Sequence, residues 1–328
     1  VSPFFAGLLM AYLLYIPENK IERSYKKAKP RFIRKNARKF AIFTTYVIAI
    51  LILVIIINFI LPVLIESINE LIGNMENYYN RVIETYNNLP EDSIFKTEKV
   101  YNALKELQNF DVQQYLSLDR ITGYVKGVVG FATGIFDVFV AFVVSIYILA
   151  ERNEILSFFK KLTKSMFKEK TVNKIERYFY RANGVFFKFI SSQFIDALIV
   201  GILATIVMKI LNIKYATLLG FAIGLFNMIP YFGAIIAISI SAIITLITGG
   251  LSKAAIMLVS IIILQQIDAN IINPKIIGDS LEISPILVIL SVTIGGGYFG
   301  VIGMFLGVPV AAILKILVND YIDNKLQV

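Results

Sequence analysis

The sequence predicts an all-α polytopic membrane protein with about seven membrane segments, some of them broken or re-entrant helices, and an exterior helical arm. Of its 328 residues, 57% are hydrophobic and 17% are charged, against roughly 45–50% and 25% in soluble domains. Residues 40–65 contain no charged side chain, and about 20 such residues already span a bilayer. The solvent expected around much of the chain is therefore lipid.

The distribution of charge predicts the topology. Residues 18–39 carry ten basic and two acidic side chains, residues 151–188 carry ten and four, and residues 66–120 carry five and ten. Cytoplasmic loops are enriched in lysine and arginine, so the first two regions are expected in the cytoplasm and the third outside. We expect a multi-pass protein of the bacterial inner membrane, whose net charge of +9 reflects this topology and not nucleic-acid binding.

Six consecutive parts are expected along the chain. They are membrane helices with a basic loop (1–65), the exterior arm (66–122), a membrane helix (123–150), a cytoplasmic amphipathic basic segment (151–184), a C-terminal core with broken helices (185–319) and a tail (320–328). Residues 1–16 are apolar without a basic leader, so we expect a membrane helix entered near its start and further sequence upstream. The basic segment is expected to lie on an anionic leaflet, as an anchor or a regulatory platform.

The arm carries the apolar spacing of a coiled coil. Steps of three and four alternate through Ile65, Ile68, Ile72, Met75, Tyr79, Val82, Tyr86 and Leu89. This seam ends at Pro90 and needs a partner. The partner is a later helix around Val100, Leu104 and Leu107, or the same helix of another subunit, and we expect a homo-oligomer; the alternative is a solvated amphipathic helix.

The C-terminal hydrophobic segments are interrupted. The motif NMIPYFG divides residues 215–248, and only ten apolar residues precede GGGYFG. Such pieces are short for a span, and irregular backbone at membrane depth must face protein or a watery cavity. The predicted helix breaks are Pro230, Gly233, Pro274, Pro285, Gly295, Gly296, Gly297 and Gly300. Pro274 is expected to end or kink a helix over residues 264–273, and the triple glycine to form a turn, or alternatively a hinge.

Amide side chains beside these breaks are candidate solute ligands. On a helix over residues 264–273, Gln266, Asn270 and Asn273 share one face, whereas Gln265 and Asp268 form another. Amides both donate and accept, so they can bind an uncharged polyhydroxylated solute. The alternative is hydrogen bonding between helices, worth about 0.6 kcal/mol per bond in membranes. The expected substrate-binding residues are Gln265, Gln266, Asn270, Asn273 and Asn227.

Three carboxylates lie in apolar segments: Asp137, Asp196 and Asp268. In hydrocarbon a carboxylate either meets a cation or keeps its proton, and both states suit coupling to an ion gradient. The alternative is a fixed ion pair. Its possible basic partners are Lys188, Lys209, Lys275 and Arg181.

Composition argues against an enzyme. The chain has neither histidine nor cysteine, which removes imidazole and thiolate catalysis and the metal sites built from those ligands. No phosphate-binding loop or metal-ligand spacing is present, so we expect no cofactor and no metal centre.

The motifs SPFFAGLLMAYLLYIPE, SIYILAER, NMIPYFGAIIA and QQIDANIINPKIIGDSLEISPILVILSVTIGGGYFGVIGMFLGVPVAAILKIL together resemble the autoinducer-2 exporter family of bacterial membrane proteins. The resemblance covers nearly the whole chain, is densest over residues 183–318 and weakest over residues 66–122. It implies a helix before Val1 and a multi-spanning carrier proposed to export the quorum-sensing signal autoinducer-2. Relatives have also been linked to sodium/proton exchange and to sporulation.

Family positions map onto this chain with two departures. The Pro-Tyr-x-Gly break corresponds to Pro230, Tyr231 and Gly233, the amide-bearing helix to Gln265 and Gln266, the following Pro-Lys to Pro274 and Lys275, and the late turn to Pro285, Gly296, Gly300, Gly303 and Pro309. Ser284 stands where the family often has histidine, and Ala234 where it often has proline. A histidine proton relay is therefore not inherited.

The expected function is transport of a small polar solute by alternating access, with or without coupling to an ion. One alternative is a sodium or other cation/proton antiporter, in which the carboxylates would have the main role. The other is a structural or sporulation-associated membrane protein, in which the exterior arm would have the main role.

Overall fold

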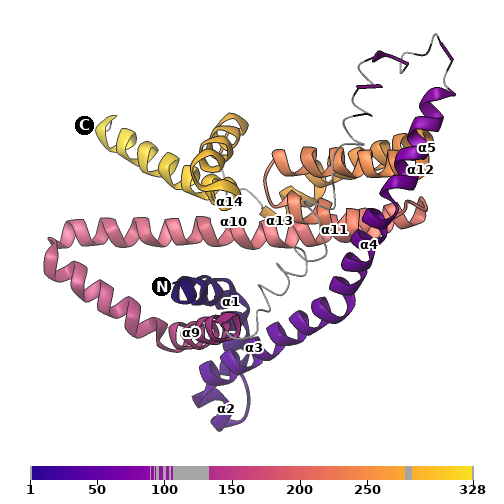
Figure 1. Cartoon of the computed structure of the whole chain (residues 1–328). Helices are drawn as coiled ribbons and strands as arrows, with labels where there is room; N and C mark the ends of the chain where they lie inside the picture. The colour runs from indigo at the N-terminus through magenta and orange to yellow at the C-terminus, as the bar shows by residue number, and fades with distance from the viewer. Residues whose placement is uncertain are drawn as a thin grey trace. The chain divides into compact units, whose positions relative to one another are not determined.

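The computed structural model describes residues 2–88, a few positions between 90 and 105, residues 133–277 and residues 283–326. Every regular element among these residues is helical, which confirms the predicted all-α class. They form two compact units (Figure 1). The first contains residues 2–72 and 133–172, and the second contains the described residues from 73 to 105 and residues 173–326.

Three helices of the first unit lie side by side: α1, α3 and α9 (Figure 1). The helices of this unit are α1 (Ser2–Lys26), α2 (Arg31–Lys35), α3 (Ala37–Ile55), η1 (Ile56–Ile60), α4 (Leu61–Gly73) and α9 (Thr133–Met166). Tyr46 is buried against Ala11 and Leu149 and hydrogen-bonds the Ser145 hydroxyl. Because burial of an unpaired hydroxyl is unfavourable, this bond lets a tyrosine occupy an otherwise apolar core.

Ion pairs join the same three helices at the end of α1. The Arg152 guanidinium on α9 binds the carboxylates of both Glu18 and Glu22, the latter at 2.6 Å. Glu22 also accepts from Lys26 at 2.8 Å and lies 3.7 Å from Arg38 Nε. Part of the basic excess in the predicted cytoplasmic region is therefore compensated by buried carboxylates from α1.

The chain stays helical across Pro274, which we expected to end or kink its helix, but the helix changes its form there. The α-helix changes to a π-helix, η2 (Asp268–Ile272), and the chain continues as α13 (Asn273–Ile277). The backbone N–H of Asn273 donates to the carbonyl of Asp268, five residues back. This wider turn makes room for the proline ring, which in a regular α-helix would meet the carbonyl four residues earlier.

A π-helix also precedes Pro62 in the first unit, where η1 comes before α4. In both cases an asparagine lies four residues before the proline. Asn58 Nδ2 donates to the Val54 carbonyl and Asn270 Nδ2 to the Gln266 carbonyl, both at 2.8 Å. The side-chain amide supplies a donor where the wider turn disturbs the regular backbone pairing.

The second unit contains the segments predicted to be broken. Its helices are α5 (Met75–Asn87), α10 (Glu169–Ile210, of which residues 169–172 belong to the first unit), α11 (Ala216–Asn227), α12 (Phe232–Ile267), η2, α13 and α14 (Pro285–Leu326). Both α12 and α14 change direction inside their length, at Gly250 (φ 81°, ψ 175°) and at Gly300 (φ 61°, ψ −147°). Such conformations are essentially restricted to glycine.

The triple glycine differs from our expectation of a turn. Residues 295–297 are helical, and the chain reverses at Gly300. Gly295 instead serves a close approach, because a Cβ there would overlap the carbonyl of Gly303 on the returning run. A Cβ at Gly307 would likewise lie 2.5 Å from the Ser291 carbonyl. The glycines thus allow two antiparallel helical runs to touch through their backbones.

Four described helices are long and apolar enough to cross a membrane: Ala37–Gly73, Glu169–Ile210, Phe232–Ile276 and Pro285–Asp323. The apolar helix α11 is shorter. Many side chains on these helices are large, apolar and exposed, as faces in contact with lipid require. The figure of about seven membrane segments stays a prediction.

The predicted arm is helical from α4 through α5. The arm's seam residues that the structure describes are half-buried, whereas Tyr78 on α5 is fully buried. Its hydroxyl lies 3.0 Å from that of Tyr215 and accepts from Lys214 Nζ at 2.6 Å. Leu89 and the expected partner helix around Val100, Leu104 and Leu107 lie outside the described residues.

Candidate functional site

The break after α11 is shaped by its own sequence. Tyr231 adopts a positive φ of 65°, and the Phe232 N–H turns back to the Pro230 carbonyl at 2.8 Å. A Cβ on Gly233 would overlap the carbonyl of Phe226, so only glycine fits there. The chain therefore ends α11 at Asn227 and starts α12 within a few residues.

A close helix crossing positions the end of α11. A Cβ on Gly224 would lie 2.6 Å from the Ala197 carbonyl and 2.7 Å from the Gly201 Cα. The backbones of α10 and α11 are therefore in direct contact at this level. Asp196 and Asn227 lie beside this contact. Asp196 is one residue before Ala197 on α10, and Asn227 is three residues after Gly224 on α11.

Asn227 connects two buried carboxylates. Its Nδ2 donates to Asp196 Oδ2 at 2.8 Å and to Asp268 Oδ2 at 3.4 Å. The exposed fractions of Asp196, Asp268 and Asn227 are 0%, 4% and 7%. The three side chains come from α10, η2 and α11. We call this set the aspartate pair with its bridging amide.

Gln193 holds the bridging residue in place. Its Nε2 donates to the backbone carbonyl of Asn227 at 2.8 Å, and Gln193 itself is 3% exposed. We did not include Gln193 among the candidate site residues. Its position three residues before Asp196, on the same side of α10, was the signal that could have identified it.

The aspartate pair has capacity for a positive charge. Oδ1 of Asp196 and Oδ1 of Asp268 have no hydrogen-bond partner within the described part of the chain. Neither carboxylate forms an ion pair among these residues, and Arg181, a possible partner, binds Asp320 at 2.8 Å instead. Two neighbouring carboxylates in a low-dielectric interior are unfavourable when both are charged, so the arrangement suits a shared proton or a bound monovalent cation.

The amide face lies apart from this pair. Gln266 and Asn270 are both exposed, and Asn270 Nδ2 also lies 3.4 Å from Gln266 Oε1. Gln265 and Asn273 are half-buried, and Gln265 Nε2 is a buried donor without a partner among the described residues. The structure therefore groups Asn227, which we expected to bind solute, with the carboxylates.

Asp137 is not part of the pair. It lies on α9 in the first unit, where its side chain is exposed.

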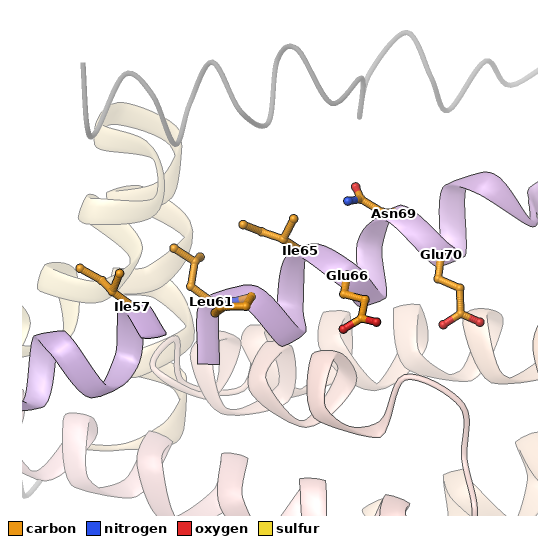
Figure 2. A pocket seen from close by; sticks show the side chains of 7 residues that line it. Ile57, Leu61, Ile65, Glu66, Asn69 and Glu70 are labelled. Carbon is orange, nitrogen blue, oxygen red and sulfur yellow. The ribbon is translucent and has the colours of Figure 1, made fainter. Parts of the chain in front are cut away.

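A hollow along η1 and α4 is a second candidate site (Figure 2). It has a volume of about 660 Å³, and its polar lining residues are Glu66, Asn69 and Glu70. Figure 2 shows Glu66 and Glu70 pointing to one side of the helix and Asn69 to the other. Because these polar groups diverge, the hollow is a weaker site than the aspartate pair, whose groups converge.

The sequence is similar to known proteins over almost its full length. Residues 1–323 match the sequence model of a family described as AI-2E family transporter. The putative transport protein YueF of Bacillus subtilis is 24% identical over 319 residues, covering 96% of this chain and 83% of that protein.

Two relatives with more specific names are also similar. The AI-2 transport protein TqsA of Escherichia coli is 28% identical over 124 residues, 38% of this chain and 36% of that protein. A sodium-lithium/proton antiporter of Halobacillus andaensis is 23% identical over 246 residues, 75% of this chain and 67% of that protein.

Proposed function

Because the chain belongs to the AI-2E transporter family, we propose that it moves a small polar solute across the bacterial cytoplasmic membrane and couples this movement to a proton or monovalent cation at Asp196 and Asp268. The observation that carries the proposal is that one amide, Asn227, binds two buried carboxylates from separate helices. Burying two carboxylates side by side is energetically unfavourable, but in a transporter it makes the energy of the site depend on whether a cation is bound.

The coupling step follows from the charge of the pair. With a proton or cation bound, Asp196 and Asp268 remain together on Asn227. Without it, repulsion between two carboxylates favours separation of η2 from α10. The π-helix before Pro274 and the Gly233 turn are the places where the backbone can accommodate this movement, which provides the alternating access.

Solute binding is assigned to the amide residues near the break. Gln265, Gln266, Asn270 and Asn273 all belong to the segment that begins one turn before Asp268. Movement of η2 would shift them together with Asp268. Their paired donors and acceptors suit a polyhydroxylated compound, and the name of the TqsA relative supports autoinducer-2 as the first solute to test.

Cation/proton exchange is the second candidate. The aspartate pair accommodates either a proton or a monovalent cation, and alternate occupancy by the two is antiport without any further solute. The name of the Halobacillus relative supports this reading. In this case the amide face serves packing.

Transport assays in proteoliposomes distinguish the two. Labelled autoinducer-2 is offered with and without an imposed proton or sodium gradient, and internal pH is recorded in parallel. Solute flux that depends on a gradient, and is lost in Asp196→Asn, Asp268→Asn and Gln266→Ala, supports coupled solute transport. Sodium-driven proton movement without solute flux, lost in both aspartate variants and retained in Gln266→Ala, supports antiport.

Asp137→Asn is the matched control, since it removes a carboxylate that lies outside the aspartate pair. Wild-type flux in both variants of the pair, Asp196→Asn and Asp268→Asn, would reject the coupling role. Loss of folding in Gln266→Ala, seen as a lower thermal midpoint, would assign that residue to packing.

A further inference from the structure

A long apolar groove runs along α14 between its two helical runs. It has a volume of about 690 Å³. Its apolar walls include Leu290, Ile294, Phe299, Leu306, Val310 and Leu314. We call it the α14 groove. Several of these side chains are highly exposed, among them Phe299 at 77% and Leu314 at 56%, so the described part of the protein leaves the groove open.

Glycine forms the floor of the groove. Gly295, Gly303 and Gly307 line it, and these are the residues through which the two runs touch. The backbones are close at the floor, whereas the large side chains on either side stand away from it. The result is a narrow channel with carbon walls between two antiparallel helical runs.

The groove has a cationic end. Lys315 and Asn319 line it there, one helical turn apart. The next residue, Asp320, accepts from Arg181 at 2.8 Å and from Arg177 at 3.2 Å. Three basic side chains, Lys315, Arg177 and Arg181, therefore belong to this end, and both guanidinium side chains are about half exposed.

The charge-based topology predicts the side of the membrane on which this end lies. Arg177 and Arg181 belong to residues 151–188, which the excess of basic residues places on the cytoplasmic side. The inner leaflet carries anionic headgroups that attract such basic clusters. On this topology, the remaining length of the groove extends from the inner surface toward the membrane interior.

We propose that the α14 groove binds one anionic phospholipid, with an acyl chain along the glycine floor and the headgroup phosphate at Lys315, Arg177 and Arg181. Residues 302–318 of the returning run extend about 24 Å at 1.5 Å per residue. This exceeds the thickness of one leaflet of the hydrocarbon core, about 15 Å. The groove is therefore long enough to hold an acyl chain.

A polar solute is a poorer occupant of this groove. Apart from its cationic end, Ser291 supplies the polar side chain in the lining, and its hydroxyl already donates to the Val288 carbonyl. A hydroxylated compound would lose its bonds to water without replacing them. A second copy of the chain would cover the apolar walls but would bring no phosphate to the basic end.

Thermal unfolding of the purified full chain in detergent tests the proposal. The probes are phosphatidylglycerol and phosphatidylcholine with the same acyl chains. Phosphatidylglycerol is expected to raise the midpoint by about 5 °C more than phosphatidylcholine, because it binds the folded state. Val310→Trp, which fills the groove, and Lys315→Gln, which removes a phosphate contact, are expected to lose most of this difference.

Two matched variants control for bulk and charge. Val301→Trp adds the same volume on the same helical run at a residue that is 68% exposed and outside the groove lining. Lys325→Gln removes an exposed charge at the end of α14. Both are expected to keep the preference for phosphatidylglycerol.

Equal stabilisation of the wild type by the two lipids would overturn the proposal, and so would an unchanged preference in Lys315→Gln. If Val310→Trp does not fold, native mass spectrometry of the wild type and of Lys315→Gln takes its place. Phosphatidylglycerol bound to both proteins would overturn the proposal. Phosphatidylglycerol bound to the wild type and lost from Lys315→Gln would support it. Because the chain has no cysteine, Leu314→Cys tests the other occupant. Efficient disulfide dimers in membranes would assign the groove to a second copy.

Discussion

Lys214 donates a hydrogen bond of 2.6 Å to the hydroxyl of Tyr78. The two residues are 136 positions apart in the chain. Tyr78 belongs to α5 in the predicted exterior arm, and Lys214 precedes α11. The Lys214 ammonium also lies over the rings of Tyr78 and Tyr215, 5.3 and 5.1 Å from their centroids. This cluster attaches α5 to the helices that carry the aspartate pair.

Removing the Tyr78 hydroxyl should loosen that attachment. Burial raises the pKa of Tyr215 above its ordinary value, so its hydroxyl stays protonated at physiological pH and needs a partner. Tyr78→Phe removes that partner and the Lys214 acceptor, with an expected loss of about 1 kcal/mol. Trypsin cleavage after Arg81 should then become roughly fivefold faster. Tyr298→Phe, at an 82% exposed residue, should leave the rate unchanged; equal rates in both variants would contradict the attachment.

The two glutamates bound to Arg152 should respond to pH in opposite senses. Burial raises the pKa of Glu18 above its ordinary value. Burial also pushes the pKa of Glu22 upward, but the hydrogen bond from Lys26 and the nearby guanidinium groups outweigh it, so this pKa lies below the ordinary 4.5. Ionised Glu22 therefore stabilises the fold above its ordinary pKa, and this contribution disappears as the pH falls through its folded pKa.

Thermal midpoints between pH 3 and 7.5 check this difference, because the contribution of Glu22 is lost below its ordinary pKa of 4.5. Glu22→Gln should be less stable than the wild type at pH 7 and approach it on acidification. For Glu18 the ionised form is the unfavourable one in the folded protein, and that penalty is fully present above the folded pKa. The thermal midpoint of Glu18→Gln should therefore rise relative to that of the wild type as the pH rises. If the thermal midpoints of the two variants changed with pH in parallel, the opposite pKa shifts of Glu18 and Glu22 would be wrong.

The crossing of α10 and α11 should not tolerate a methyl group. A Cβ on Gly220 would overlap the Thr205 hydroxyl and lie 2.6 Å from the Thr205 backbone nitrogen. Gly220→Ala is expected to destabilise the protein by about 1–3 kcal/mol, because the backbones must separate. Gly297→Ala is the control, since this helical glycine has no atom within 4 Å of the added Cβ and alanine favours the helix by up to about 1 kcal/mol. Thermal midpoints that fall equally in both variants would contradict the crossing.

The reversal at Gly300 should depend on glycine for a conformational reason. Space is available, because no atom lies within 4 Å of a Cβ built there. The backbone at φ 61° and ψ −147° is nevertheless strained for any other residue. Gly300→Ala is expected to lower the free energy of unfolding by about 1–3 kcal/mol. A midpoint as high as that of Gly297→Ala would show that the turn relaxes without strain.

Local features of the fold could be predicted from the sequence. The apolar runs predicted helices in a membrane, and Pro230 with Gly233 marked the break between α11 and α12. Pro274 was expected to end or kink its helix, because a proline ring clashes with the preceding turn of a regular α-helix. A π-helix before the ring removes that clash.

The candidate site was only partly visible in the sequence. Periodicity placed Gln266 and Asn270 on one face and Asp268 on another, which the contacts and burial bear out. It did not say which face turns inward, because the lipid-facing side of a membrane helix is as apolar as the protein core.

Composition, charge distribution and local breaks are properties of short stretches, so the sequence was sufficient for the helical class and for the break between α11 and α12, although not for the helical course of residues 295–297. The meeting of Asp196, Asn227 and Asp268 is a different kind of fact. It joins residues 31 and 41 positions apart, and it depends on a glycine contact between α10 and α11 and on the π turn that carries Asp268. Pairing over such separations is set by how helices pack against each other, and that packing is what brings two carboxylates to one amide.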